Sequence, residues 1–358
     1  MIASRNYDCF NGSCLTSCKH SDIIWYCKNC NQNYGEYAIG NKCLKCNNEL
    51  IPKCPFCNDN VLVDAPLSLN SGNIYSVVGS PFSGKTLFLK TFALLSSNSF
   101  YSADHFNAKS RKFLFEYEEL SSTSHISELP PATILLSPPI FIRHKKGHHD
   151  YWRLFYEIPA IFFNKAFPAE FEELFRRTTT LILMFDPFNM PGLVEKNALP
   201  LKPYHMRKRQ LQPSTGFISN SIQYFLSQTQ DFEKQFDIQI IVIISKADVL
   251  RYSTIFHPDK KIRTLCEEAY RSSRGQIPAQ SDKIRELFLL VAADEDVFSL
   301  NKLEISCRKP IKYFPFSALM IPPFISNHQT ETDSQRLLYH SRKLNHSAAI
   351  PIIMNLAP

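Results

Sequence analysis

The chain has 358 residues and a formal net charge of +7, with 44% hydrophobic and 20% charged residues, which is the composition of a globular protein. No apolar run approaches the ~20 residues that a membrane-spanning helix needs, and residues 1–8 lack the apolar core of a secretory signal. We therefore expect a cytoplasmic protein without a membrane span. The positive charge would fall by about four if eight thiolates held two zinc ions, so it supports a nucleic-acid partner only weakly.

Nine of the 11 cysteines lie within the first 57 residues. Cys27 and Cys30 form one Cys-x-x-Cys pair, and Cys43 and Cys46 form another after 12 intervening residues, which is the pattern of a zinc ribbon. Each pair makes one knuckle, and two knuckles supply four sulfur ligands in a tetrahedron. Because four protein ligands leave no open position on the ion, we predict a structural zinc site.

A third pair, Cys54 and Cys57, needs two further ligands. We predict that Cys14 and Cys18 complete this second site, which gives about two Zn²⁺ ions per chain. The alternative ligands are Cys9 and His20. Zinc ribbons contact protein and nucleic acid with similar ease, so the module does not identify its partner.

The composition changes along the chain and divides it into four parts. Residues 1–63 are polar and rich in cysteine, which predicts a zinc-ribbon module that metal must hold together. Residues 64–72 have the Pro, Ser, Asn and Gly content of a linker. In residues 73–323 short apolar runs alternate with amphipathic helical stretches, which predicts an α/β domain with a doubly wound, mainly parallel sheet. Residues 324–358 look like a C-terminal tail that docks on this domain.

The first motif of this domain is a phosphate-binding loop of the form G-x-x-x-x-G-K-[ST]. An apolar strand, residues 74–78, precedes it, and a helical stretch, residues 87–95, follows it. Lys85 is expected to reach the β- and γ-phosphates, and the Thr86 hydroxyl to ligate Mg²⁺. The residues expected to bind nucleotide are Gly79, Ser80, Pro81, Phe82, Ser83, Gly84, Lys85 and Thr86.

Two sensors of the γ-phosphate should follow this loop. Thr133, in a proline-rich loop, is the candidate that caps Mg²⁺. Glu157, after the strand 151–156, takes the place of the Asp in a D-x-x-G motif, and Ala160 takes the place of the Gly. Alanine restricts the backbone movement that glycine permits, and no glutamine follows to orient a water molecule. The sequence therefore predicts slow intrinsic hydrolysis, with Lys85, Thr133 and Glu157 as the catalytic candidates.

Asp186 follows the apolar run 181–185 and has two interpretations. In an ATPase it would be the Walker B carboxylate. In a GTPase it would only end the fourth strand. We favour the second interpretation, because Glu157 is then available for the metal position.

The last two motifs indicate a guanine-binding pocket. The buried strand 238–244 ends in Ser245, Lys246, Ala247 and Asp248, which resembles the [NST]-K-x-D element of GTPases. The Asp248 carboxylate can accept two hydrogen bonds from guanine that adenine cannot supply. Lys246 would lie along the base, and Ser245 could tie this loop to the phosphate loop. About 70 residues later come Ser317 and Ala318, where a backbone amide would reach guanine O6.

In this order the motifs GSPFSGKT, LPPAT, YEIPA, LMFDPFNMP, ISKAD and FPFSAL resemble the bacterial double-GTPase family, a TRAFAC-like branch of P-loop GTPases. The resemblance covers residues 27 to about 320. It implies a P-loop GTPase-like domain that switches between GTP and GDP with Mg²⁺, and protein partners in a bacterial conflict or defence system. The third-strand motif departs from that family at Glu157 and Ala160.

Two other functions remain open at the level of sequence. A pseudo-GTPase would bind guanine nucleotide without turning it over. A zinc-ribbon P-loop ATPase would use Asp186 and act with nucleic acid. Phosphate release separates the first alternative from a GTPase, and base preference separates the second.

Overall fold

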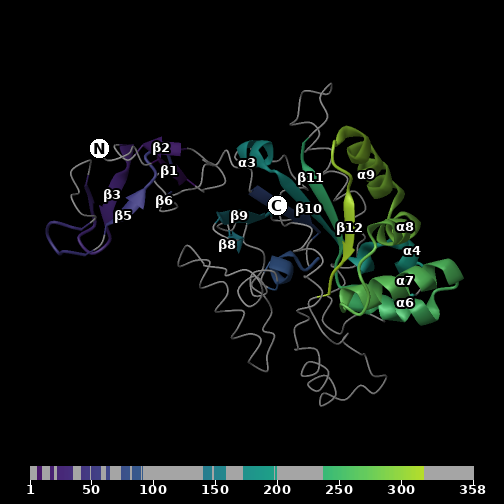
Figure 1. The fold of residues 1–358 in the computed structure, drawn as a ribbon. Helices are drawn as coiled ribbons and strands as arrows, with labels where there is room; N and C mark the ends of the chain where they lie inside the picture. The colour runs from purple at the N-terminus through teal and green to yellow at the C-terminus, as the bar shows by residue number, and fades with distance from the viewer. Residues whose placement is uncertain are drawn as a thin grey trace, which may run out of the picture. The chain divides into compact units, whose positions relative to one another are not determined.

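The structure is a computed structural model, and it describes residues 6–9, 17–19, 22–34, 42–48, 50–57, 62–64, 74–80, 83–89, 91, 140–146, 149–158, 172–196, 198–199 and 237–317. The chain divides into two units (Figure 1). The first comprises residues 1–74 and 168–178, and the second comprises residues 75–167 and 179–358. Among the described residues, no helix is both long and apolar enough to cross a membrane.

The first unit contains two small antiparallel sheets of three strands each, in the orders β2-β1-β6 and β4-β3-β5. It also contains the short helix α3 (Glu172–Arg177). The strands are β1 (Asn6–Cys9), β2 (Ser17–Lys19), β3 (Ile24–Cys27), β4 (Gln32–Tyr34), β5 (Ile51–Lys53) and β6 (Leu62–Asp64).

Cysteine side chains make up most of the buried cluster of this unit. Ile23, Trp25 and Leu50 are its only buried residues other than cysteine among those described, and five cysteines complete it. Three apolar side chains bury too little surface to stabilise a fold of this size, since a fully buried one contributes about 1.5–3 kcal/mol. A bound metal ion is the usual source of the missing stability in so small a unit.

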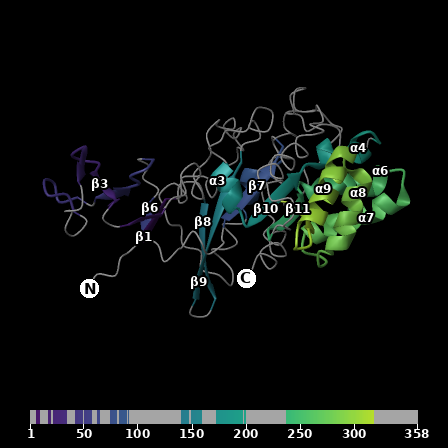
Figure 2. The ribbon, with the colours of Figure 1, turned by 90° about the horizontal axis from the view of Figure 1, so that it is seen from above.

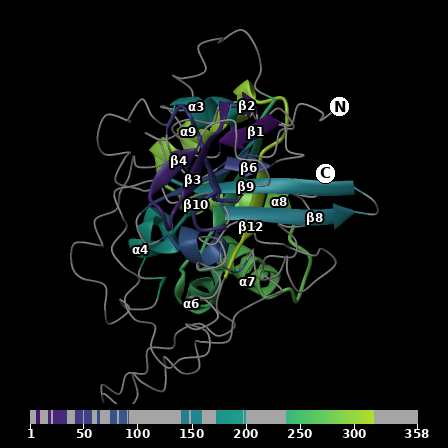
Figure 3. The ribbon, with the colours of Figure 1, turned by 90° about the vertical axis from the view of Figure 1, so that its left-hand side faces the viewer.

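The second unit contains a six-stranded sheet in the order β12-β11-β10-β7-β9-β8. Strands β7, β10, β11 and β12 pair in parallel, and β8 pairs antiparallel with β9, so the fold is α/β with a mainly parallel sheet. Figure 3 shows β8 and β9 side by side. The strands are β7 (Ile74–Gly79), β8 (Ile140–Lys146), β9 (His149–Glu157), β10 (Thr180–Phe185), β11 (Gln239–Ile244) and β12 (Lys312–Pro315).

The central strands of this sheet are buried on both faces. Every residue of β7 and β10 is buried, and so are five of the six residues of β11. Continuous runs of apolar residues, many of them β-branched, are typical of parallel strands that helices cover on both faces. This accounts for the uninterrupted apolar runs that the sequence contains at these positions.

Strand order determines where a ligand can bind. The chain forms β7 in the middle of the sheet, builds β8 and β9 on one side, and then crosses over to build β10, β11 and β12 on the other. Where two neighbouring strands connect onward to opposite sides of the sheet, a crevice forms at their carboxyl ends. Open α/β sheets bind ligands in this crevice. In this chain, that position lies between β7 and β10.

Helices gather beside β10, β11 and β12, as Figures 1 and 2 show. Helices α7 and α8 contact β12, and α6 packs against α7. Helix α7 begins at a definite position because the Asp259 carboxylate accepts hydrogen bonds from the backbone N–H groups of Lys261 and Ile262. The helices are α4 (Pro191–Val194), α6 (Leu250–Phe256), α7 (Lys260–Ser273), α8 (Ser281–Val291) and α9 (Asp294–Ser306).

Candidate functional site

The loop after β7 curves tightly, and its two glycines are required for different reasons. A Cβ atom on Gly79 would lie 2.6 Å from Ser83 Oγ and 2.7 Å from the carbonyl oxygen of Met184, so only glycine fits beside β10. Gly84 has a φ angle of +86°, which side chains disfavour. The following helix begins as Phe88 N–H donates to the Gly84 carbonyl at 2.8 Å. Pro81 and Phe82 lie outside the described residues.

The side chain of Lys85 lies inside the curve of this loop. Its ammonium group donates to the carbonyl oxygens of Gly79, at 2.9 Å, and Ser80, at 3.1 Å. Burial lowers the pKa of Lys85 to about 8, and the nearby charge of Glu157 opposes that shift. Ser83 Oγ is also buried here and has no hydrogen-bond partner among the described residues. The loop thus holds a buried cation and an unused hydroxyl, which suits an anionic ligand.

Thr86 and Glu157 meet at the carboxyl ends of β7 and β9. The Thr86 hydroxyl lies 2.8 Å from both carboxylate oxygens of Glu157 and donates its proton to them. The end of β9 is fixed to β7, because Ile158 N–H donates to the Val77 carbonyl at 2.9 Å. A hydroxyl beside a carboxylate supplies the hard oxygen ligands that Mg²⁺ prefers. Thr133 and Ala160, the other candidates of this region, lie outside the described residues.

Asp186 is buried, and both of its carboxylate oxygens are engaged away from Thr86. One oxygen accepts a hydrogen bond from Lys246 Nζ at 2.6 Å, and the other accepts one from Phe188 N–H at 3.1 Å. The Lys246 ammonium also lies 5.6 Å from the centre of the Phe188 ring. Of the two carboxylates that the sequence offers for the metal position, Glu157 is therefore the one that contacts Thr86.

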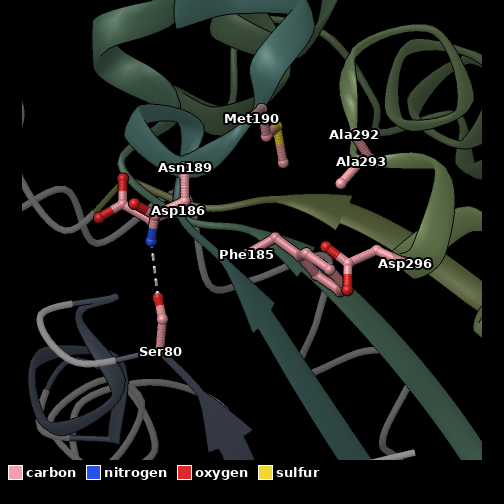
Figure 4. Close-up of a pocket in the computed structure, with 8 residues that line it drawn as sticks. All are labelled: Ser80, Phe185, Asp186, Asn189, Met190, Ala292, Ala293 and Asp296. Atoms are coloured by element: carbon pink, nitrogen blue, oxygen red, sulfur yellow. Dashed lines mark hydrogen bonds between the residues drawn. The ribbon is translucent and has the colours of Figure 1, made fainter. Parts of the chain in front are cut away.

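A small pocket lies at the carboxyl ends of β7 and β10 (Figure 4). On its wall, the side-chain amide of Asn189 donates to Ser80 Oγ at 3.1 Å, the bond that is dashed in Figure 4. Sequence reasoning did not single out Asn189, although its position in the Asp-Pro-Phe-Asn turn after β10 indicates that it lies near the phosphate loop. The pocket is lined by Ser80, Phe185, Asp186, Asn189, Met190, Ala292, Ala293 and Asp296.

The loop after β11 begins with two constrained residues. Lys246 has a left-handed backbone with φ of 47°, which turns the chain sharply. The hydroxyl of Ser245 donates to the carbonyl oxygen of Phe185 at 2.9 Å. Ser245 is thus tied to the end of β10 and not to the phosphate loop, which differs from the contact that the sequence suggested.

Asp248 and Ser317 are brought together although 69 residues separate them. Ser317 Oγ donates to Asp248 Oδ1 at 2.7 Å, and both side chains are buried. The backbone holds this contact, because Ala247 N–H donates to the Phe316 carbonyl at 3.0 Å. Burial raises the pKa of Asp248 to about 6, and the bond from Ser317 opposes the shift, so the carboxylate is ionised at pH 7. Ala318 lies outside the described residues.

In the first unit, the four sulfur atoms of Cys27, Cys30, Cys43 and Cys46 lie within 4.8 Å of one another. The distance from Cys27 Sγ to Cys46 Sγ is 3.4 Å, and from Cys30 Sγ to Cys43 Sγ it is 3.7 Å. Zn–S bonds of about 2.3 Å in a tetrahedron place sulfur atoms roughly 3.8 Å apart, so this group can hold a zinc ion. The Tyr34 hydroxyl, 3.1 Å from Cys43 Sγ, lowers the pKa of that thiol to about 6, whereas the hydrogen bond to Cys46 raises the pKa of Cys30 to about 12.

The second group of sulfur atoms contains Cys9, one of the alternative ligands that the sequence offered. Cys54 and Cys57 gather with Cys9, within 4.8 Å of one another, and Cys9 Sγ lies 3.5 Å from Cys57 Sγ. Cys18 is buried in the same cluster and faces Tyr7 across β1 and β2, so it shares a sheet face with Cys9. Cys14 lies outside the described residues, as does His20. Three cysteines can therefore hold a second metal ion, and Cys18 is buried in the same cluster, although its sulfur is not one of the three that lie together.

Four motifs that are distant in sequence lie at the carboxyl ends of strands in one sheet: the loop after β7, the end of β9 and the loops after β11 and β12. A mainly parallel α/β sheet with polar groups at this edge fits nucleotide binding. No protein-family model matches this chain, and no curated protein matches it either.

Proposed function

We propose that the protein is a guanine-nucleotide-binding switch with a P-loop GTPase-like domain and slow or partner-stimulated GTP hydrolysis. The observation that carries this proposal is the buried Asp248–Ser317 contact, which lies at the same edge of the sheet as Lys85 and the Thr86–Glu157 pair. The end of that edge with Lys85, Thr86 and Glu157 suits phosphates and magnesium. The end with Asp248 and Ser317 suits a nucleotide base.

The phosphate end would work through charge. Lys85 would exchange its two carbonyl partners for oxygens of the β- and γ-phosphates, which are stronger acceptors because they are ionised. The backbone N–H groups at the start of the following helix would donate to the same anion. Thr86 and Glu157 would hold Mg²⁺, which supplies positive charge next to the transferring phosphoryl group.

The base end would work through hydrogen-bond complementarity. Ionised Asp248 accepts hydrogen bonds only, and guanine offers two N–H donors on one edge. Ser317 fixes one carboxylate oxygen, which limits the positions that the carboxylate can take. Adenine would leave this buried acceptor unpaired, and an unpaired buried carboxylate is costly.

The Asp186 contacts argue against an ATPase that uses this residue as its metal carboxylate. Both of its oxygens have partners, Lys246 Nζ and Phe188 N–H, and freeing them for a metal would break the ion pair of a buried carboxylate with a partly exposed lysine. A pseudo-GTPase shares the whole proposed binding site. It differs only in turnover, which depends on Glu157 and on residues 160 and 133.

The N-terminal cysteines support a zinc-ribbon module with two Zn²⁺ ions, held by Cys27, Cys30, Cys43 and Cys46 and by Cys9, Cys54 and Cys57 with Cys18. Both zinc sites would be structural, since four sulfur ligands leave no open position on the ion for a substrate. We propose that this module contacts a protein partner of the switch.

Calorimetry of the full chain with Mg·GTP and Mg·ATP tests the proposed function. We expect GTP to bind about 10- to 100-fold more tightly, because an unsatisfied buried acceptor costs on the order of 1–3 kcal/mol. Asp248→Asn should reduce this preference and raise the affinity for xanthosine triphosphate, whose 2-oxo group can accept from the amide. Equal affinities of the unmodified chain for GTP and ATP would refute the guanine assignment.

A further inference from the structure

The four residues after β10 contact both loops of the proposed nucleotide site. We call residues 186–189 the linking segment. It consists of Asp186 and a single 3-10 turn, Pro187–Asn189, which Asp186 caps by accepting from Phe188 N–H. The turn is rigid for its length, because Pro187 fixes its first backbone angle and Met190 N–H closes it onto the Pro187 carbonyl at 3.1 Å.

One end of the linking segment holds Lys246 of the base-reading loop. The ion pair from Lys246 Nζ to Asp186 is 2.6 Å long, and the side chain of Asp186 is only 3% exposed. Phe188 presents its ring to the same ammonium group. These contacts stabilise Lys246 where its backbone takes the strained left-handed conformation.

The other end holds the phosphate loop. Asn189 donates its side-chain amide to Ser80 Oγ, and Ser80 is the residue whose carbonyl accepts from Lys85. Ser80 is itself buried, so this bond is shielded from water. A chain of direct contacts therefore runs from Lys246 through Asp186 and Asn189 to Ser80.

Ser245 was expected from the sequence to contact the phosphate loop directly, but it does not. Its hydroxyl is used by the Phe185 carbonyl, immediately before the linking segment. We propose that the linking segment couples the two loops, with Asp186 and Asn189 as positioning residues. When Lys246 of the base-reading loop is held by Asp186, the phosphate loop is held in the conformation that binds phosphate more tightly. The inference rests on the proposed function.

A double-mutant cycle on the full chain tests this coupling. The probe is Mg·pyrophosphate, which occupies the phosphate loop and has no base. Lys246→Met removes the charge that Asp186 binds, and we expect it to weaken pyrophosphate binding about three- to tenfold. In the Asn189→Ala background, Lys246→Met should have no further effect, since the chain of contacts is already broken. An electrostatic effect of Lys246 acting through space would instead be equal in both backgrounds.

The matched control is Asn301→Ala, an asparagine that is exposed on α9 and far in sequence from both loops. It should leave pyrophosphate and GTP affinity unchanged. Asn189→Ser is the second variant, because a serine side chain is too short to reach Ser80 and disturbs the turn less. Asn189→Ala should also lower the ratio of GTP to ATP affinity by a few-fold, an effect that a loss of folding stability alone would not produce.

The outcomes separate the two claims. If the unmodified chain binds GTP selectively but Lys246→Met leaves pyrophosphate affinity unchanged, or weakens it equally in both backgrounds, the coupling is refuted and the proposed function stands. If the unmodified chain binds neither GTP nor pyrophosphate, the proposed function fails and the coupling fails with it. Loss of the Lys246 effect only when Asn189 is replaced supports both.

Discussion

Asp248 is the residue whose chemistry should be most visible in pH dependence. Its folded pKa is about 6, raised from 3.8 by burial, and the charged groups of the loop near it are Lys246 and Asp186. Guanine binding requires the ionised form. We therefore expect GTP affinity to be highest above pH 6.5 and to fall as pH drops through 6 to 5, where the carboxyl becomes protonated.

The same shift predicts the sign of a stability change without nucleotide. Between pH 4 and 6 the folded chain keeps a proton on Asp248 that the unfolded chain has released. The contribution of this group to the free energy of unfolding therefore decreases as pH rises from 4 to 6.

The pH dependence of GTP affinity is measured by calorimetric titrations with GTP at several pH values. Asp248→Asn is the control, because its GTP affinity should depend much less on pH in this range.

Glu157 is the residue on which turnover should depend. Its carboxylate contacts Thr86 directly, so the extra methylene does not keep it out of the metal position. We expect the double substitution Glu157→Asp with Ala160→Gly to speed phosphate release, because it restores the shorter carboxylate and the mobile backbone of the D-x-x-G motif. Single-turnover phosphate release measures the rate. Rapid release by the unmodified chain, at several per second without a partner, would contradict the slow hydrolysis proposed here.

At the scale of elements, the six apolar runs that the sequence offers at residues 74–78, 140–144, 152–156, 181–185, 238–244 and 313–316 are all strands of one sheet. The runs in β7, β10, β11 and β12 could be predicted because parallel strands are buried on both faces and are continuously apolar. Helix α9 was not predicted, since Phe298 and Ile305 are exposed on its outer side and weaken its amphipathic pattern. Sequence spacing alone could not decide between Cys9 and the other candidate ligands, because the pairing of β1 with β6 that brings Cys9 to Cys54 is non-local.

The close approach of α4 to α8 predicts a stability effect. A Cβ atom on Gly192 would lie 2.7 Å from Val291 Cα and 3.0 Å from the Leu290 carbonyl oxygen, both of them backbone atoms that cannot move alone. We expect Gly192→Ala to lower the free energy of unfolding by about 1–3 kcal/mol. The midpoint of urea unfolding measures this, with Val194→Ala, a half-exposed position in the same helix, as the control. An unchanged midpoint for Gly192→Ala would show that the two helices separate at little cost.

The two groups of cysteines predict a metal content. We expect elemental analysis to find about two zinc ions per chain, and Cys9→Ser to reduce this to about one while leaving the site at Cys27 filled. Cys30→Ser should have the more severe effect on folding, because metal binding contributes much of the folding free energy of such a unit. Two zinc ions retained by Cys9→Ser would return Cys14 to the ligand set.

At the scale of the whole molecule, the chain joins a unit whose buried cluster is mostly cysteine side chains to a unit built around a mainly parallel sheet. The motifs proposed to bind phosphate, metal and base could be found in sequence because each occupies a short stretch after a strand. The turn after β10 indicates that Asn189 lies near the loop after β7, but its hydrogen bond to Ser80 Oγ depends on β7, β10 and β11 lying side by side. Contacts between distant residues, and not local pattern, define that part of the proposed site.

The pairing of β1 with β6 has a consequence for how the protein is made. Residues 6–9 and 62–64 lie on neighbouring strands, so the cysteine-rich unit is closed by its own first and last strands. Chains emerge from the ribosome amino end first, and domains generally fold as units during synthesis. A cysteine-rich segment that closes on itself can capture its ions while the sheet downstream is still being translated. If the proposed zinc ions bind, these strands would then need zinc earlier in translation than the sheet would need nucleotide.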